Sequence, residues 1–151
     1  MDGSIGRGKV AGQVMGNKIK YREGYKYQLA EDYSVQVNIF PSHIIETDYI
    51  ILTNTGLLIG KRGYAWDGAS GPAIDTKNFM RGSLVHDELA QLMRQGLLEI
   101  KWLDMANREL CRICREDGMS WIRAQWVYWG VTLAGDSFAR AGTDRPILEA
   151  P

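Results

Sequence analysis

Residues 64–72 read Tyr64-Ala65-Trp66-Asp67-Gly68-Ala69-Ser70-Gly71-Pro72, and they divide the chain into two halves with different hydrophobic patterns. Before this stretch the apolar residues alternate with polar ones, which is typical of half-buried strands. After it they recur at helical spacing. Strands followed by helices indicate the α+β class, in which helices pack on one face or end of an antiparallel sheet. We therefore expect a small antiparallel N-terminal sheet with about three C-terminal helices packed on it.

The strand-like half runs from Lys18 to Gly63. Its apolar residues alternate in four groups, which are Tyr25 to Leu29, Tyr33 to Ile39, Tyr49 to Thr53 and Leu57 to Ile59. The tripeptide Asn54-Thr55-Gly56 between the last two groups predicts a hairpin loop, because glycine adopts positive φ without strain. These signals together predict a sheet of about four or five strands.

The helical half contains three segments. The first follows Pro72, with Asp75 or Thr76 as its N-cap and Gly96 as its terminator. The second runs from about Lys101 to Asp117 and ends at Gly118, and the third is capped by Ser120 and continues from Trp121 towards Gly142. We expect a flexible glycine-rich arm at residues 1–17, a single α+β domain at 18–142 and a loose tail at 143–151.

Composition and charge narrow the class of protein. The chain has 151 residues, of which 45% are hydrophobic, and its 18 basic and 18 acidic residues cancel. Because the net charge is zero, the protein as a whole does not attract nucleic acid or an anionic membrane electrostatically, and we expect neither as a partner. The most membrane-like stretch, Trp121 to Ala139, contains Arg123, Gln125 and Asp136, which favours a buried helix over a membrane span. The N-terminus does not resemble a signal peptide, and we expect a soluble intracellular protein.

Four polar residues stand out because carboxylates and imidazoles are costly to bury without a partner. Asp67 lies where the last strand gives way to a glycine-rich turn, with Ser70 beside it. His86 shares the inner face of the first helix, and Asp87 is rotated from it by about 100°. Asp104 lies near the start of the second helix, on a line with Asn107. We expect these groups to converge on one cleft.

Two interpretations of this cluster remain open. In the first, Asp67, His86 and Asp104 hold a divalent metal ion, and the catalytic residues His86, Asp87 and Asp67 help metal-bound water to attack a phosphoester or amide. In the second, the groups are structural: Asp67 caps a turn or the first helix, His86 bonds to Asp67 or Asp104, and Asp87 pairs with Arg94 or Arg81. The first interpretation predicts a hydrolase, and the second predicts a non-catalytic protein.

Three further features favour structural roles. Cys111 and Cys114 lie deep in their helix rather than at its N-terminus, so we expect two reduced thiols packed near the core. His43 is expected at the surface of a loop. The tryptophans of the third helix fall at helical spacing, which favours core packing over a stacking platform for a sugar or base; they are Trp121, Trp126 and Trp129.

With these residues the chain resembles a family of small phage and prophage proteins that is described as a domain of unknown function. The matching motifs are Asp67-Gly68-Ala69-Ser70-Gly71-Pro72, His86-Asp87, Leu103-Asp104 and Trp126-Val127-Tyr128-Trp129, and the match covers roughly Tyr49 to Gly142. The chain departs from the family at Glu88-Leu89, where a Leu-Tyr pair often follows His-Asp.

The resemblance implies a phage origin and a clustered Asp/His site, without supplying a reaction. It leaves two functions open. One is a phage-encoded metal-dependent hydrolase that acts on a substrate of unknown identity. The other is a non-catalytic phage protein, either a virion or assembly component or an inhibitor of a host defence system. The expected location is the host cytoplasm or the virion, and the oligomeric state is not readable from the residues.

Overall fold

The computed structural model describes residues 19–21, 26–68, 76–139 and 148–150. The chain divides into two compact units, Met1–Glu23 with Arg145–Pro151 and Gly24–Asp144. In the first unit, β1 (Ile19–Tyr21) pairs antiparallel with β8 (Leu148–Ala150), with Ile19 opposite Ala150. The sequence predicted a loose tail where β8 lies, and the predicted arm at 1–17 falls outside the described residues.

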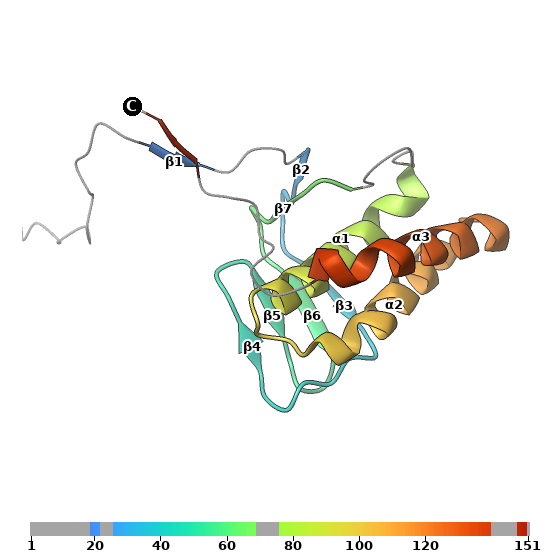
Figure 1. The fold of residues 1–151 in the computed structure, drawn as a ribbon, viewed down its shortest axis with the longest axis horizontal. Coiled ribbons are helices and arrows are strands. Elements are labelled where there is room, and N and C mark those ends of the chain that lie inside the picture. Colours follow the sequence, from blue (N-terminus) through green and yellow to red (C-terminus); the bar gives the residue numbers. More distant parts are fainter. Residues whose placement is uncertain (1–18, 22–25, 69–75, 140–147, 151) are drawn as a thin grey trace, which may run out of the picture. The chain divides into compact units, whose positions relative to one another are not determined.

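The second unit contains an antiparallel four-stranded sheet in the order β3-β6-β5-β4 (Figure 1). Its strands are β3 (Tyr33–Gln36), β4 (Ile45–Glu46), β5 (Ile50–Leu52) and β6 (Leu57–Gly60). A separate pair joins β2 (Tyr27–Gln28) to β7 (Ala65–Trp66). Gly56 adopts φ +86° in the loop between β5 and β6, which confirms the predicted hairpin.

Three α-helices follow the strands (Figure 1). They are α1 (Lys77–Arg94), α2 (Leu103–Glu116), which a short 3₁₀ turn at Ile100–Trp102 precedes, and α3 (Trp121–Ala139). Thr76 is the N-cap residue of α1, and the backbone N–H of Arg123 donates to the Ser120 hydroxyl at the start of α3. Gly96 and Gly118 adopt positive φ just after α1 and α2, as the predicted terminators require.

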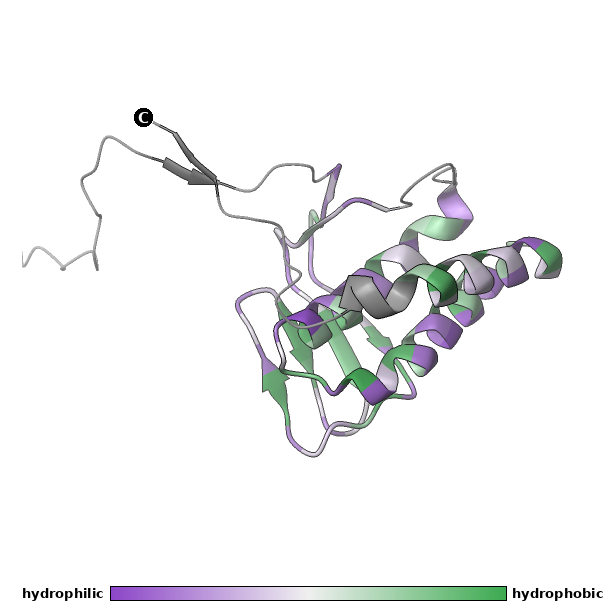
Figure 2. Cartoon of the chain, in the orientation of Figure 1, coloured by the Kyte–Doolittle hydropathy of each residue, from purple (hydrophilic) through white to green (hydrophobic). Residues whose placement is uncertain are grey.

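The main hydrophobic core lies between the sheet and the first two helices. Its fully buried members include Ile50 and Leu58 from the strands and Leu89 from α1. Figure 2 shows hydrophobic residues on the strands of the sheet and along α1, where this core forms. Apolar burial is the main stabilising term in such a layer. The strands-then-helices pattern of the sequence is therefore confirmed as an α+β fold.

A second, smaller core joins the three helices, where Phe79, Leu110, Cys114, Met119 and Ala124 pack together. At Gly82 the helices α1 and α2 approach closely, because a Cβ built there would lie 2.7 Å from Cys114 Sγ and 2.9 Å from Leu110 Cδ1. The absence of a side chain at this position therefore sets the distance between the two helices.

Candidate functional site

His86 projects from α1 towards α2 and is 5% exposed. Its Nε2 atom lies 2.7 Å from Asn107 Oδ1. An amide oxygen only accepts hydrogen bonds, so Nε2–H donates and the imidazole is held as that tautomer. Burial lowers the pKa of His86, which keeps the ring neutral at neutral pH. The predicted partners were Asp67 or Asp104, and the observed partner is Asn107, one helical turn beyond Asp104.

The other two predicted metal ligands lie in different surroundings. Asp67 follows β7, and its Oδ1 accepts a hydrogen bond of 3.2 Å from the backbone N–H of Lys26 beside β2. Asp104 is exposed on α2, where its carboxylate accepts hydrogen bonds from Tyr128 Oη at 2.6 Å and Arg108 Nε at 2.8 Å. The hydrogen bond from Tyr128, followed by that from Arg108, lowers the pKa of Asp104.

The predicted convergence of Asp67, His86 and Asp104 is not seen. Within the part of the chain that the structure describes, no group of three or more His, Cys, Asp or Glu side chains is placed to hold a metal ion. The glycine-rich turn after Asp67, including Ser70, lies outside the described residues. Asp104 instead connects α2 to α3 through its hydrogen bond from Tyr128.

Asp87 follows His86 on α1 and is half-buried. Burial raises the pKa of Asp87 to about 7, and the charge of Arg94 opposes that rise. The structural interpretation named Arg94 or Arg81 as its partner. Arg81 instead donates to both carboxylate oxygens of Asp117, at 2.8 and 3.0 Å, and to Glu116.

Glu88 is a buried carboxyl group that the sequence interpretation did not select. It is fully buried, and neither of its oxygens has a hydrogen-bond partner among the described residues. Its side chain lies against the backbone of β6, since a Cβ built at Gly60 would be 2.0 Å from Glu88 Oε1. Burial raises the pKa of Glu88 well above its ordinary value, which favours the protonated form of the carboxyl group. We call His86, Asp87 and Glu88 the polar run of α1.

Glu109 on α2 is equally buried but is fully engaged. It accepts hydrogen bonds from the backbone N–H of Asn38 at 3.1 Å and from Arg112 Nε at 2.7 Å. Arg112 also donates to the backbone oxygen of Gln36 at 3.1 Å, which ties α2 to the strand β3. A buried carboxylate with such partners is structural.

The two cysteines pack as predicted. Both are free thiols, Cys114 is buried among the helices, and Cys111 Sγ contacts the backbone oxygen of Ala124 at 3.0 Å. Burial raises the pKa of Cys114 to about 12 and also raises that of Cys111. Both thiols are therefore poor nucleophiles. His43 is exposed in its loop, also as predicted.

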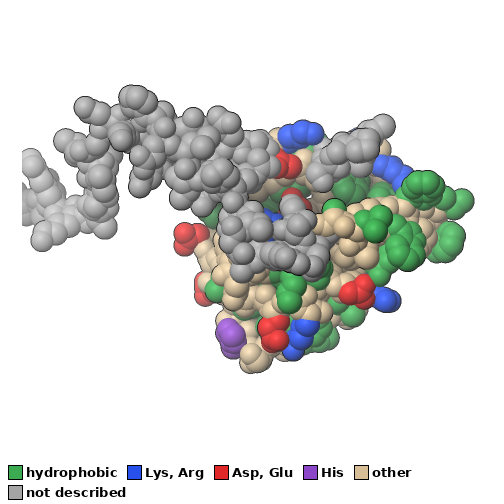
Figure 3. All heavy atoms as spheres, viewed as in Figure 1, with side chains coloured by type: hydrophobic (Ala, Val, Ile, Leu, Met, Phe, Trp, Pro, Cys, Tyr) green, Lys and Arg blue, Asp and Glu red, His purple; other side chains and the backbone are tan. Residues whose placement is uncertain are grey.

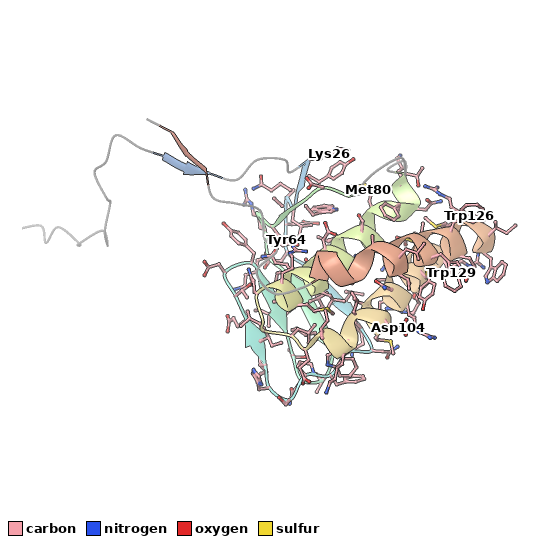
Figure 4. The ribbon with its side chains drawn as sticks, viewed as in Figure 1. Lys26, Tyr64, Met80, Asp104, Trp126 and Trp129 are labelled. Atoms are coloured by element: carbon pink, nitrogen blue, oxygen red, sulfur yellow. The ribbon has the colours of Figure 1, made fainter. Side chains whose placement is uncertain are left out.

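The prediction of a buried third helix is wrong for one of its faces. Ala124, Val127 and Val131 face the helical core, whereas a second set of apolar side chains points outward. We call this set the outer face of α3; its members and their exposed fractions are Trp121 63%, Ile122 66%, Trp126 77%, Trp129 59% and Leu133 85%. Figure 3 shows hydrophobic side chains gathered at the right-hand end of the view, where Figure 4 labels Trp126 and Trp129.

Sequence reasoning treated α3 as one apolar stripe, although the helix carries two. A helix that is apolar on all sides needs cover on all sides. The signal was present, because the apolar residues of α3 outnumber those that a single inward stripe requires. The burial of Glu88 could also have been predicted. Glu88 lies four residues from both Leu84 and Leu92, which places it on the inner apolar stripe of α1.

Comparison of the chain with family models, with curated proteins and with solved structures finds no match. Among the described residues, no helix combines the length and the apolar character needed to cross a membrane.

Proposed function

We propose that this protein is a non-catalytic component of a phage assembly, and that it joins another protein through the outer face of α3. One observation carries the proposal: five large apolar side chains are exposed together on one helix. Soluble proteins expose large apolar side chains singly, and a contiguous patch marks an interaction surface. Tryptophan is also the residue type most enriched at binding hot spots.

The outer face of α3 favours an apolar protein partner. Arg123 is the only charged residue between Trp121 and Ala134. Its guanidinium turns towards the start of α1, where Nη1 donates to Thr76 Oγ1 at 2.9 Å. The face therefore lacks the cations that nucleic acid or an anionic lipid surface requires. An apolar helix or groove of another protein complements it better.

Two of the predicted site residues, His86 and Asp104, support a structural role. His86 Nε2–H is directed at the Asn107 amide in the interior, where it connects α1 to α2. Asp104 uses its two oxygens to hold Tyr128 and Arg108. Both contacts connect two helices, since His86 joins α1 to α2 and the exposed Asp104 joins α2 to α3 through Tyr128.

Site-specific photo-crosslinking tests the interaction surface. Trp126 is replaced with p-benzoylphenylalanine, and the protein is irradiated inside its host cell. The matched control carries the same amino acid in place of Ile44, which is 58% exposed in a loop of the sheet. The proposal predicts a discrete crosslinked product from position 126 and little from position 44. Equal, diffuse labelling from both positions would contradict it.

A metal-dependent hydrolase is the second candidate, because the half-buried carboxyl group of Asp87 follows His86 on α1. The raised pKa of Asp87, about 7, is the value that suits a general acid or base at neutral pH. Metal content is the discriminating measurement, on wild type, His86→Ala and Asp67→Ala after exposure to Mg²⁺, Mn²⁺ or Zn²⁺. Stoichiometric metal that both folded variants lose supports the hydrolase. Loss of stability in His86→Ala with no bound metal in wild type supports the assembly protein.

A further inference from the structure

The outer face of α3 has the spacing of a helix-pairing seam. Ile122, Trp126, Trp129 and Leu133 follow one another at intervals of four, three and four residues. Alternating steps of three and four keep side chains on one side of a helix and in line with a partner helix. The stripe is therefore suited to a second α-helix that lies along it.

The same face also provides a hole for a large side chain. A knob from a partner helix inserts between residues at positions i, i+3, i+4 and i+7. On α3 these positions are held by Trp126, Trp129, Gly130 and Leu133. Gly130 forms the floor of the hole, and no described atom lies within 4 Å of a Cβ built there.

The face thus carries both halves of one contact: protruding tryptophans and a glycine-floored hole that fits a tryptophan. Surfaces that complement themselves form two-fold symmetric dimers, in which each copy supplies the same patch. We propose that α3 pairs with α3 of a second copy of this chain in antiparallel orientation, with Trp126 of each copy seated over Gly130 of the other. This inference rests on the proposed function, because it names the partner of the same face.

The exposed area of the seam approaches what such a dimer needs. With up to roughly 250 Å² for a tryptophan and less for leucine or isoleucine, the exposed parts of the four seam residues amount to roughly 600 Å² in each copy. A stable interface of standard size buries about 800 Å² from each partner. The outer face of α3 alone supplies most of that area.

One ring of the face is already held in place. Tyr128 and Trp129 stack edge to face, with centroids 5.7 Å apart and planes at 73°. Tyr128 is itself anchored, because its hydroxyl donates to Asp104. A side chain that is ordered before binding loses less entropy when the complex forms. This hydrogen bond also gives Asp104 a role in positioning the interface.

Sedimentation equilibrium of the purified full chain tests the dimer. Wild type is expected to sediment as a dimer that dissociates on dilution. Gly130→Leu fills the hole and Leu133→Glu charges the seam, and both variants are expected to be folded monomers whose unfolding temperature does not depend on protein concentration. The matched control, Ile44→Glu, also charges an exposed apolar position and should remain a dimer.

Either of two outcomes overturns the inference. One is a wild type that is monomeric at every concentration, and the other is a dimer that persists in both Gly130→Leu and Leu133→Glu. The crosslink at position 126 separates this failure from failure of the proposed function. A product of about twice the 17.0 kDa chain mass identifies a second copy. A product with a different protein refutes the dimer and keeps the assembly role, and equal labelling at positions 126 and 44 refutes both.

Discussion

Helices α1 and α3 both depart from the usual arrangement of side chains. Helix α1 buries polar groups, whereas helix α3 exposes apolar ones. The polar run of α1 places an imidazole and two carboxyl groups in or near the core, whereas the outer face of α3 leaves three tryptophans in solvent. Polar groups that are buried must be hydrogen-bonded or neutral, and apolar groups that are exposed need a covering surface. The comparison separates residues that build this fold from residues that are available to a partner.

The largest expected effect is on the stability of variants at two buried glutamates. Replacement with methionine should lower the free energy of unfolding at one of them and raise it at the other. Glu109→Met removes the acceptor of Asn38 N–H and Arg112, and should lower the free energy of unfolding by about 2–3 kcal/mol. Glu88→Met replaces a carboxyl group that has no hydrogen-bond partner among the described residues, and should raise the free energy of unfolding by about 1–2 kcal/mol at pH 7. Urea unfolding of both variants measures the difference. A loss of similar size in both would show that Glu88 has a stabilising contact in solution.

Two glycines give the same kind of contrast between core and surface. Gly82→Ala places a methyl group 2.7 Å from Cys114 Sγ, and should cost about 1–3 kcal/mol through overpacking. Gly130→Ala meets no described atom, and should stabilise the monomer by about 0.5–1 kcal/mol because alanine favours the helix. Thermal unfolding in dilute solution checks both signs. Destabilisation by Gly130→Ala would mean that α3 is covered within its own chain.

Stability should also depend on pH in a direction that the polar run determines. The folded pKa values of Asp87 and Glu88 are raised, so the folded chain keeps protons that the unfolded chain releases above about pH 4. Stability is therefore lost as pH rises from about 4 through 7, by up to about 1.4 kcal/mol per pH unit for each proton. His86 acts oppositely, since its lowered pKa costs stability below about pH 6.5. Glu88→Gln should reduce the loss of stability as pH rises above about 4, as measured by urea unfolding from pH 4 to 9. An unchanged slope would show that Glu88 is not protonated in the folded state.

The smallest effect on stability is expected on the outer face of α3. Trp126→Ser removes a large side chain that is 77% exposed, and in dilute solution should change the free energy of unfolding by less than about 0.5 kcal/mol. Chemical unfolding at low protein concentration checks this value. A loss of several kcal/mol would place Trp126 among the residues that build the fold.

The sequence predicted the architecture well because its signals are local. Alternating apolar residues, Gly56 in a hairpin and Gly96 after α1 each act over a few residues, and each was confirmed. The predicted partners of His86 were wrong because they depend on how α2 is rotated against α1. Gly82 lets α2 approach α1 closely, and in this packing Asn107, rather than Asp104, lies opposite the imidazole.

The exposure of α3 was missed for a different reason. Periodicity tells which residues share a face, but it does not tell whether a second apolar face is covered. Trp126 and Trp129 have the spacing of a core stripe, and only the packing of Ala124 and Val127 against α2 shows that they point away from the core. The metal-dependent hydrolase stays a prediction. The structure gives contacts of Asp67 and His86, but these contacts do not test whether the two residues take part in a reaction.

The concentration dependence of thermal unfolding tests the central claim most directly, because only a contact between copies makes the unfolding temperature depend on protein concentration. The account predicts that the unfolding temperature of wild type rises as the protein is concentrated, and that the temperature of Trp126→Ser stays constant. A wild-type unfolding temperature that is independent of concentration, or a rise of equal size in Trp126→Ser, would contradict it.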